Sequence, residues 1–164
     1  IHLEAREIDR LNEVGASLIH CPTSNTFIGS GLFDIARLAS GSTKVGLATD
    51  IGGGSSFSML RTMACAYEIA QLRGIALHPA QLMWLATQGS AKALHLDDQI
   101  GSLTAGMAAD LVVLDLSSTP EISQRSKRAN DVWEEIFPTI MMGDDRAIVA
   151  TYVAGEKAYQ RGVI

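Results

Sequence analysis

The sequence predicts an α/β fold that begins with alternating helices and parallel strands and ends in a small β-rich region. Two short apolar segments, Ala16–His20 and Thr43–Ala48, are each flanked by helical patterns. This arrangement is typical of strands that crossover helices bury on both faces. After about Leu96 the pattern changes to short apolar runs separated by turn residues. The 164 residues are enough to build a real hydrophobic core.

The first predicted element is a helix over Glu4–Val14. Its apolar residues Ala5, Ile8 and Leu11 recur every three positions with charges on the other face, and Gly15 is suited to end it. The elements predicted next are the strand Ala16–His20, a loop opened by Pro22 and Asn25 that runs to Gly31, a helix over Leu32–Ala39 ended by Gly41, the strand Thr43–Ala48, a long helix over Ser58–Arg73 closed by Gly74, and helical segments over Pro79–Gln88 and Ser90–Leu94.

Residues 98–164 are predicted to form a smaller region beside the first, which comprises residues 1–97. The elements expected there are a turn-rich strand entry over Ile100–Gly106, a strand over Ala109–Leu114, a polar loop over Ser117–Asn130, a helix over Asp131–Met142 that is kinked or broken at Pro138, and a hairpin of Ile148–Val153 and Glu156–Tyr159. The parallel part has only two strands, too few for a closed barrel or a stable open sheet. We therefore expect the missing strands to come from residues before Ile1.

Composition and charge exclude several classes of function. A formal net charge of −5 argues against a nucleic-acid partner, and the short basic cluster Arg125, Lys127 and Arg128 is interpreted as solvated surface. No apolar run approaches the ~18 residues needed to cross a bilayer, and no signal peptide is visible. Cys21 and Cys65 lie far apart without a disulfide or zinc-finger spacing. Reduced thiols in a cytoplasmic protein are the simpler interpretation.

Asp50 is the strongest candidate for chemistry, because it follows directly after a buried apolar strand. A carboxylate in that position requires a metal, a cation or donated hydrogen bonds. The glycines Gly52–Gly54 allow the backbone to approach a ligand closely. They are not a phosphate loop, since no Lys-Ser/Thr follows them, and the nearby serines lack a Gly-x-Ser-x-Gly frame. An ordinary turn aspartate before a flexible loop remains the alternative interpretation.

His20 ends the other parallel strand, and βα barrels place their active sites at the carboxyl ends of the strands. A single histidine in such a position is also often a hydrogen-bonded packing residue, so both interpretations stay open. The other histidines are interpreted as structural or solvated. They are His2, His78 and His95.

Several motifs together resemble the amidohydrolase superfamily and, within it, the guanine deaminases. The resemblance covers nearly the whole chain, and the Gly53–Leu60 stretch and Gly143-Asp-Asp-Arg146 resemble guanine deaminases in particular. The other motifs are His20-Cys-Pro-Thr-Ser-Asn25, Ile28-Gly-Ser-Gly31, Gly46-Leu-Ala-Thr-Asp50, Leu85-Ala-Thr87, Ile100-Gly-Ser-Leu103 with Gly106, and Ala109-Asp-Leu-Val-Val-Leu114.

The resemblance implies that the chain is the C-terminal part of a (β/α)8 barrel together with part of a small β-sandwich. In this family one zinc ion is held by two histidines after the first strand, a histidine after the fifth and an aspartate after the eighth, which Asp50 matches. A glutamate after the fifth strand, the general acid and base, lies outside the chain. The substrate-contacting histidine after the sixth strand falls just before Ile1, so His2 does not take that role. His20 matches a histidine after the seventh strand. It is expected to support the site from behind its direct ligands, and substrate binding is the role assigned to it.

The activity implied by the resemblance is zinc-dependent hydrolysis of guanine to xanthine and ammonia. Zinc lowers the pKa of bound water to about 7. A metal-bound carboxylate such as that of Asp50 can accept the proton of this water, so its expected roles are metal binding, substrate binding and catalysis. The intact protein is expected to be a homodimer in the cytoplasm that acts on a small molecule, with iron as an alternative metal.

Two alternatives remain. The first is a chlorohydrolase-like or other aminohydrolase of the same superfamily that acts on a different heterocycle. The second is a non-catalytic fragment, because catalytic zinc sites take about three protein ligands and this chain offers one clear candidate. We therefore expect that the isolated chain neither binds zinc tightly nor converts guanine.

Overall fold

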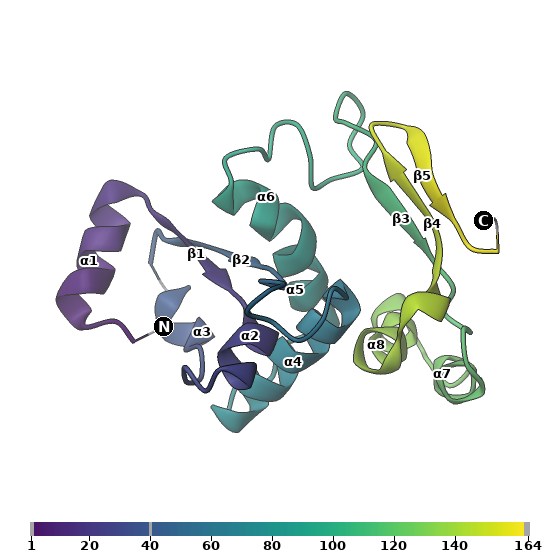
Figure 1. The fold of residues 1–164 in the computed structure, drawn as a ribbon, viewed down its shortest axis with the longest axis horizontal. Helices are drawn as coiled ribbons and strands as arrows, with labels where there is room; N and C mark the ends of the chain where they lie inside the picture. The colour runs from purple at the N-terminus through teal and green to yellow at the C-terminus, as the bar shows by residue number, and fades with distance from the viewer. Residues whose placement is uncertain (1, 40, 163–164) are drawn as a thin grey trace.

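The computed structural model describes residues 2–39 and 41–162 and contains two separate sheets (Figure 1). Helices and parallel strands alternate in the first part, as the sequence predicts for an α/β fold. The elements of this part are α1 (Ala5–Val14), β1 (Ser17–His20), α2 (Pro22–Phe27), α3 (Ile35–Leu38), β2 (Lys44–Leu47), α4 (Met59–Leu72), α5 (Pro79–Trp84), the π-helix η1 (Leu85–Gly89) and α6 (Ser90–Ala93).

The strands β1 and β2 run parallel, with Ser17 opposite Lys44 and His20 opposite Leu47. Their carboxyl ends therefore lie at the same edge of the two-stranded sheet. Gly15 ends α1 in the left-handed conformation, with φ of +66°, as its position in the sequence predicts.

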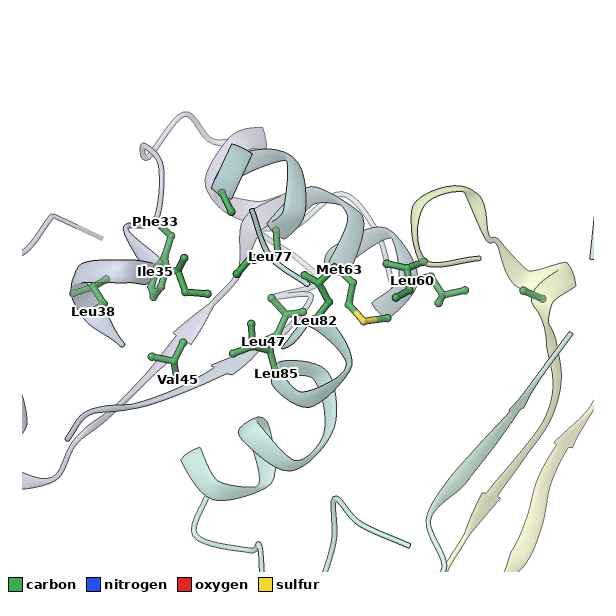
Figure 2. Close-up of a cluster of buried hydrophobic side chains, with 14 residues drawn as sticks. Phe33, Ile35, Leu38, Val45, Leu47, Leu60, Met63, Leu77, Leu82 and Leu85 are labelled. Carbon is green, nitrogen blue, oxygen red and sulfur yellow. The ribbon is translucent and has the colours of Figure 1, made fainter. Parts of the chain in front are cut away.

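A hydrophobic core lies between β2 and the helices that cover it. Figure 2 shows that Leu47 of β2 points toward side chains of α4 and of α5 with the adjoining π-helix. The buried members of this core are Phe33, Ile35, Leu38, Val45, Leu47, Leu60, Met63, Ala66, Ala70, Leu77, Leu82, Leu85, Ile140 and Ala147. Because Ile140 and Ala147 belong to the second part of the chain, the core joins the two parts.

The second part holds an antiparallel sheet in the order β3–β4–β5, packed beside two helices (Figure 1). The predicted hairpin is confirmed, and its turn residues Ala154 and Gly155 both have positive φ, as a tight hairpin turn requires. The elements are β3 (Leu111–Leu114), α7 (Pro120–Ser126), α8 (Val132–Met142), the 3-10 helix η2 (Asp145–Ala147), β4 (Ile148–Val153) and β5 (Glu156–Gln160).

Two segments predicted as loops are helical. The loop expected from Pro22 to Gly31 begins with α2, and the loop expected over Ser117–Asn130 contains α7. In each case a proline occupies the first helical turn, where its missing amide costs nothing. Thr119 caps α7 by accepting a hydrogen bond from the Ile122 amide at 3.3 Å.

Three further predictions differ from the structure in extent. The helix expected over Leu32–Ala39 is only Ile35–Leu38, because Asp34 caps it by accepting a bond from the Arg37 amide. No strand forms over Ile100–Gly106. The helix α8 continues through Pro138 and is not broken there. In the described part of the chain, no helix combines the length and apolar character needed to cross a membrane.

Candidate functional site at the carboxyl ends of the parallel strands

The loops that follow β1 and β2 lie against each other. The Ala48 amide donates to the His20 carbonyl at 3.0 Å, which continues the parallel ladder one residue past β2. The Thr23 hydroxyl then donates to the Thr49 carbonyl at 3.3 Å. These two bonds bring the start of α2 beside the loop that carries Asp50.

Asp50 begins a tight turn and has a left-handed backbone, with φ of +50°. Asp and Asn adopt this conformation more readily than most residues that are not glycine. The Asp50 carbonyl accepts hydrogen bonds from the amides of Gly53 at 3.0 Å and Gly54 at 2.6 Å. The backbone of Asp50 is therefore fixed by the glycine turn that follows it.

The glycines in this turn are required by close contacts. A Cβ atom on Gly54 would lie 2.1 Å from the Thr49 carbonyl oxygen, so no other residue fits without a shift of the loop. A Cβ atom on Gly53 would lie 3.1 Å from both Asp50 Oδ2 and Ser24 Oγ. The Asp50 carboxylate and the Ser24 hydroxyl thus both face the bare backbone of Gly53.

The Asp50 side chain is exposed, which differs from the expectation that a carboxylate at the end of a buried strand must be compensated within the chain. Among the described residues, its carboxylate has no hydrogen bond or ion pair. Within the same residues, no group of three or more His, Cys, Asp or Glu side chains could hold a metal ion. The described part of the chain therefore presents one unpaired carboxylate at this strand end.

His20 has the opposite environment. Its side chain is 2% exposed and stacks on Phe33, with ring centroids 4.4 Å apart and planes inclined by 18°. Burial lowers the pKa of His20 from 6.5 to about 4, so the ring is neutral at neutral pH. Its Nδ1 atom is buried and has no hydrogen-bond partner among the described residues. A buried ring nitrogen without a partner is uncommon and indicates an interaction still to be satisfied.

Cys21 is intermediate in burial between the exposed Asp50 and the buried His20. The thiol is partly exposed and free, and its pKa is raised by burial and, to a smaller extent, by the charge of Asp50. Cys65 is buried, and both cysteines are free.

The structure assigns local roles to the other histidines. His78 caps α5 by accepting a bond from the Ala80 amide at 3.1 Å. His2 Nε2 lies 2.9 Å from the Ser30 carbonyl oxygen, and His95 Nδ1 lies 3.0 Å from Lys44 Nζ. These contacts agree with structural or surface roles.

Sequence reasoning missed Thr23 and Ser24, which line the site from α2. Both side chains are 2% exposed. The only available signal was the motif that follows His20, and its segment was predicted as a loop. Had a helix been predicted there, Thr23 and Ser24 would have fallen in its first turn, and both would have been expected to face the loop after β2.

Comparison with known proteins identifies the family. The sequence model of the amidohydrolase family matches residues 1–158. Guanine deaminase of Escherichia coli strain K12 is 43% identical over 161 residues, which are 98% of this chain and 37% of that protein. A 5-methylthioadenosine/S-adenosylhomocysteine deaminase of Haloquadratum walsbyi is 39% identical over 122 residues, which are 72% of this chain and 27% of that protein.

Solved structures lead to the same family. The E. coli guanine deaminase structure matches with a TM-score of 0.95, and the matched region covers 98% of this chain and 38% of the E. coli chain. An adenosine deaminase from Xanthomonas campestris with bound zinc, 28% identical, matches with a TM-score of 0.81 and covers 99% of this chain and 36% of its own. The chain spans less than two fifths of the length of these proteins. With a match over nearly its whole length, the chain belongs to the amidohydrolase family.

Proposed function

We propose that this chain is the C-terminal part of a zinc-dependent guanine deaminase and contributes one metal ligand to its active site. In this proposal, residues 1–97 belong to a (β/α)8 barrel in which β1 and β2 are the last two strands. Residues 98–164 belong to a small β-sandwich. The parallel β1–β2 pair and the likeness to E. coli guanine deaminase, at 43% identity, support this arrangement.

The observation that carries the proposal is the free carboxylate of Asp50. Its backbone is fixed by two hydrogen bonds to the glycine turn, while its side chain is exposed at the carboxyl end of β2. A carboxylate oriented in this way can enter a metal site completed by residues from other segments. A zinc ion held there by Asp50 and by residues outside this chain would supply activated water, with a pKa lowered to about 7.

The residues of this chain would then bind substrate and move protons. The Asp50 carboxylate can accept the proton of the attacking water and transfer it toward the leaving amine of guanine. The hydroxyl of Ser24 also faces the bare backbone of Gly53 and is a further polar group beside the space that a substrate would enter. The absence of side chains on the glycine turn leaves room for a flat purine ring close to the backbone.

His20 is proposed as a neutral group on the substrate side of the site. Its pKa of about 4 means that it does not carry charge near neutral pH. Because Phe33 covers one face of the ring, the side chain is held in one orientation. Its unpartnered Nδ1 atom can accept or donate a hydrogen bond to a group that completes the site.

An exchange of segments provides the test. This chain would replace the matching segment of E. coli guanine deaminase, 37% of that protein, to give a chimaera with all family ligands. We expect the chimaera to release ammonia from guanine and to contain zinc, and we expect the isolated chain to do neither. A zinc-loaded chimaera that leaves guanine unchanged would contradict the substrate assignment. Stoichiometric, tightly held zinc in the isolated chain would contradict the single-ligand account.

A second candidate is deamination of a different purine or nucleoside by the same site. The 39% identity to the H. walsbyi deaminase, over 72% of this chain, supports keeping this candidate. The same chimaera would be assayed with guanine, adenosine, 5-methylthioadenosine and a chlorinated triazine. Preference for adenosine or 5-methylthioadenosine would favour the second candidate, and chloride release from the triazine would favour a chlorohydrolase.

A further inference from the structure

The outer edge of β2 is closed by a side chain at the residue that precedes the active-site loop. The Ala48 amide points toward β1, where it bonds to the His20 carbonyl. Alternate residues of a strand direct their backbone groups to opposite sides. The amide and carbonyl of Leu47 therefore point away from β1, to the edge where a further strand would pair.

The hydroxyl group of Ser90 occupies this edge position. Its oxygen accepts a hydrogen bond from the Leu47 amide at 3.0 Å. The same Oγ atom lies 2.7 Å from the Leu85 carbonyl oxygen and 3.1 Å from the Leu47 carbonyl oxygen, to either of which the hydroxyl can donate. One side chain thus bonds both backbone groups of Leu47 and ties the end of β2 to the helix behind it.

The surrounding structure is built to bring Ser90 to this point. Ser90 directly follows η1, a single π-helical turn, a feature often found at functional sites. A Cβ atom on Gly89 would lie 2.7 Å from ring carbons of Trp84, so the turn accepts only glycine without rearrangement. A Cβ atom on Gly46 would lie 3.0 Å from both Cα and Oγ of Ser90. Two glycines therefore make the close approach of Ser90 to β2 possible.

We propose that Ser90 is a positioning residue that fixes the place of Asp50 by holding the end of β2. This inference rests on the proposed role of Asp50. Only Ala48 and Thr49 separate Leu47 from Asp50, so a shift of the strand end is transmitted directly to the carboxylate. Because both backbone groups of Leu47 are bonded to Ser90, the end of β2 is held in place relative to α6.

The first test measures the contact itself, by amide hydrogen exchange in the chimaera with E. coli guanine deaminase. The variant Ser90→Ala removes the hydroxyl, and Ser90→Thr restores it. We expect exchange at the Leu47 amide to accelerate about tenfold or more, relative to the Ala48 amide, in Ser90→Ala. Ser90→Thr is expected to return the ratio toward the original value. The ratio separates this local effect from a general loss of stability.

Ser126→Ala is the matched control. It removes another partly buried serine hydroxyl, which donates to the Glu135 carbonyl at 3.0 Å between α7 and α8, far from β2 in the chain. We expect it to leave the Leu47 to Ala48 exchange ratio unchanged. An unchanged ratio in Ser90→Ala, or an equal change in Ser126→Ala, would overturn the assignment of Ser90.

The second test measures the consequence for the site, in the chimaera with E. coli guanine deaminase. Groups that orient metal ligands typically contribute about 10- to 100-fold to metal affinity or activity. We expect Ser90→Ala to weaken zinc affinity and lower kcat within that range, with recovery in Ser90→Thr and no change in Ser126→Ala. If Ser90→Ala alters the exchange ratio but neither zinc affinity nor kcat, the positioning role is wrong. If Asp50→Asn keeps both zinc and activity, the proposed function fails while the exchange result still stands.

Discussion

Two neighbouring strands end in polar residues with opposite environments. His20 closes β1 and is 2% exposed, stacked on Phe33 and neutral near neutral pH, because burial lowers its pKa to about 4. Asp50 follows β2 and is exposed, with its carboxylate unpaired among the described residues. The carboxyl ends of β1 and β2 lie together, so strand order alone does not determine which of the two side chains is exposed to a ligand.

The difference arises from the segment that each strand leads into. After β1 the chain enters α2 at once, and Phe33 packs against the His20 ring from the segment before α3. After β2 the chain makes a glycine turn that lifts the Asp50 side chain away from the core. A strand end followed directly by a helix thus buries its last side chain, whereas a glycine turn presents the next one to solvent or to a ligand.

The largest expected effect is the loss of activity when Asp50, and not His20, is substituted. In the chimaera, Asp50→Asn keeps the size and the left-handed backbone preference of the side chain but removes its charge. We expect ammonia release to fall by about 1,000-fold, the scale of a lost proton-transfer group. Because Asp50 is exposed, the free energy of unfolding in urea should change by less than about 1 kcal/mol. Asp98→Asn, at another exposed aspartate, should leave both quantities unchanged.

The burial of His20 should make the free energy of unfolding depend on pH. The pKa of His20 is about 4 in the folded protein and 6.5 in the unfolded chain, so the unfolded chain binds an additional proton between these values. Stability should therefore be complete above pH 6.5 and fall as the pH decreases toward 4, by about 3 kcal/mol in total. Urea unfolding at a series of pH values would measure this.

A substitution at the same position provides the control for that slope. Glutamine does not titrate, so His20→Gln should lose the part of the pH dependence that the burial of His20 causes. An undiminished slope in His20→Gln would show that the acid sensitivity arises elsewhere.

Substitutions in the glycine turn after Asp50 should have a smaller effect on stability. Gly54→Ala forces a Cβ atom to within 2.1 Å of the Thr49 carbonyl oxygen and should cost about 1–3 kcal/mol of stability. Gly52→Ala meets no atom within 4 Å but must adopt a φ of +112°, so it should cost about 1 kcal/mol. Thermal or urea unfolding of the two variants would rank them. The reverse order would mean that the contacts of the turn are described incorrectly.

The smallest effect links the two strand ends directly. The charge of Asp50 helps to raise the pKa of the Cys21 thiol, so Asp50→Asn should lower that pKa and increase the thiolate fraction. Alkylation of Cys21 by iodoacetamide at mildly alkaline pH should become a few-fold faster. Cys65 is the internal control, because Asp50 is not among the groups that shift its pKa. Equal acceleration at both cysteines would indicate a general loosening of the structure.

Periodicity and end signals predicted much of the fold. The helix α1 with Gly15, the parallel pair of β1 and β2, and the final hairpin were all visible as spacing of apolar residues with turn residues at their ends. The helices α2 and α7 were missed because their sequences are polar and begin with proline, which marks a helix start as well as a break.

The candidate site was predicted less completely, for a physical reason. The position of Asp50 follows from strand order, but its exposure depends on the turn geometry at Gly53 and Gly54, which spacing does not encode. The bonds from Ser90 to Leu47 join residues 43 positions apart through a π-helical turn, and no local pattern predicts such a contact.

The zinc content of the chimaera tests the central claim most directly. After removal of loosely bound metal, the original chimaera and His20→Gln should each keep about one zinc ion per subunit, because His20 is not proposed as a ligand. Asp50→Asn should keep less than about a tenth of that amount. An Asp50→Asn chimaera that retains one zinc ion with unchanged affinity would contradict the account, since the free carboxylate at the end of β2 would then not hold the metal.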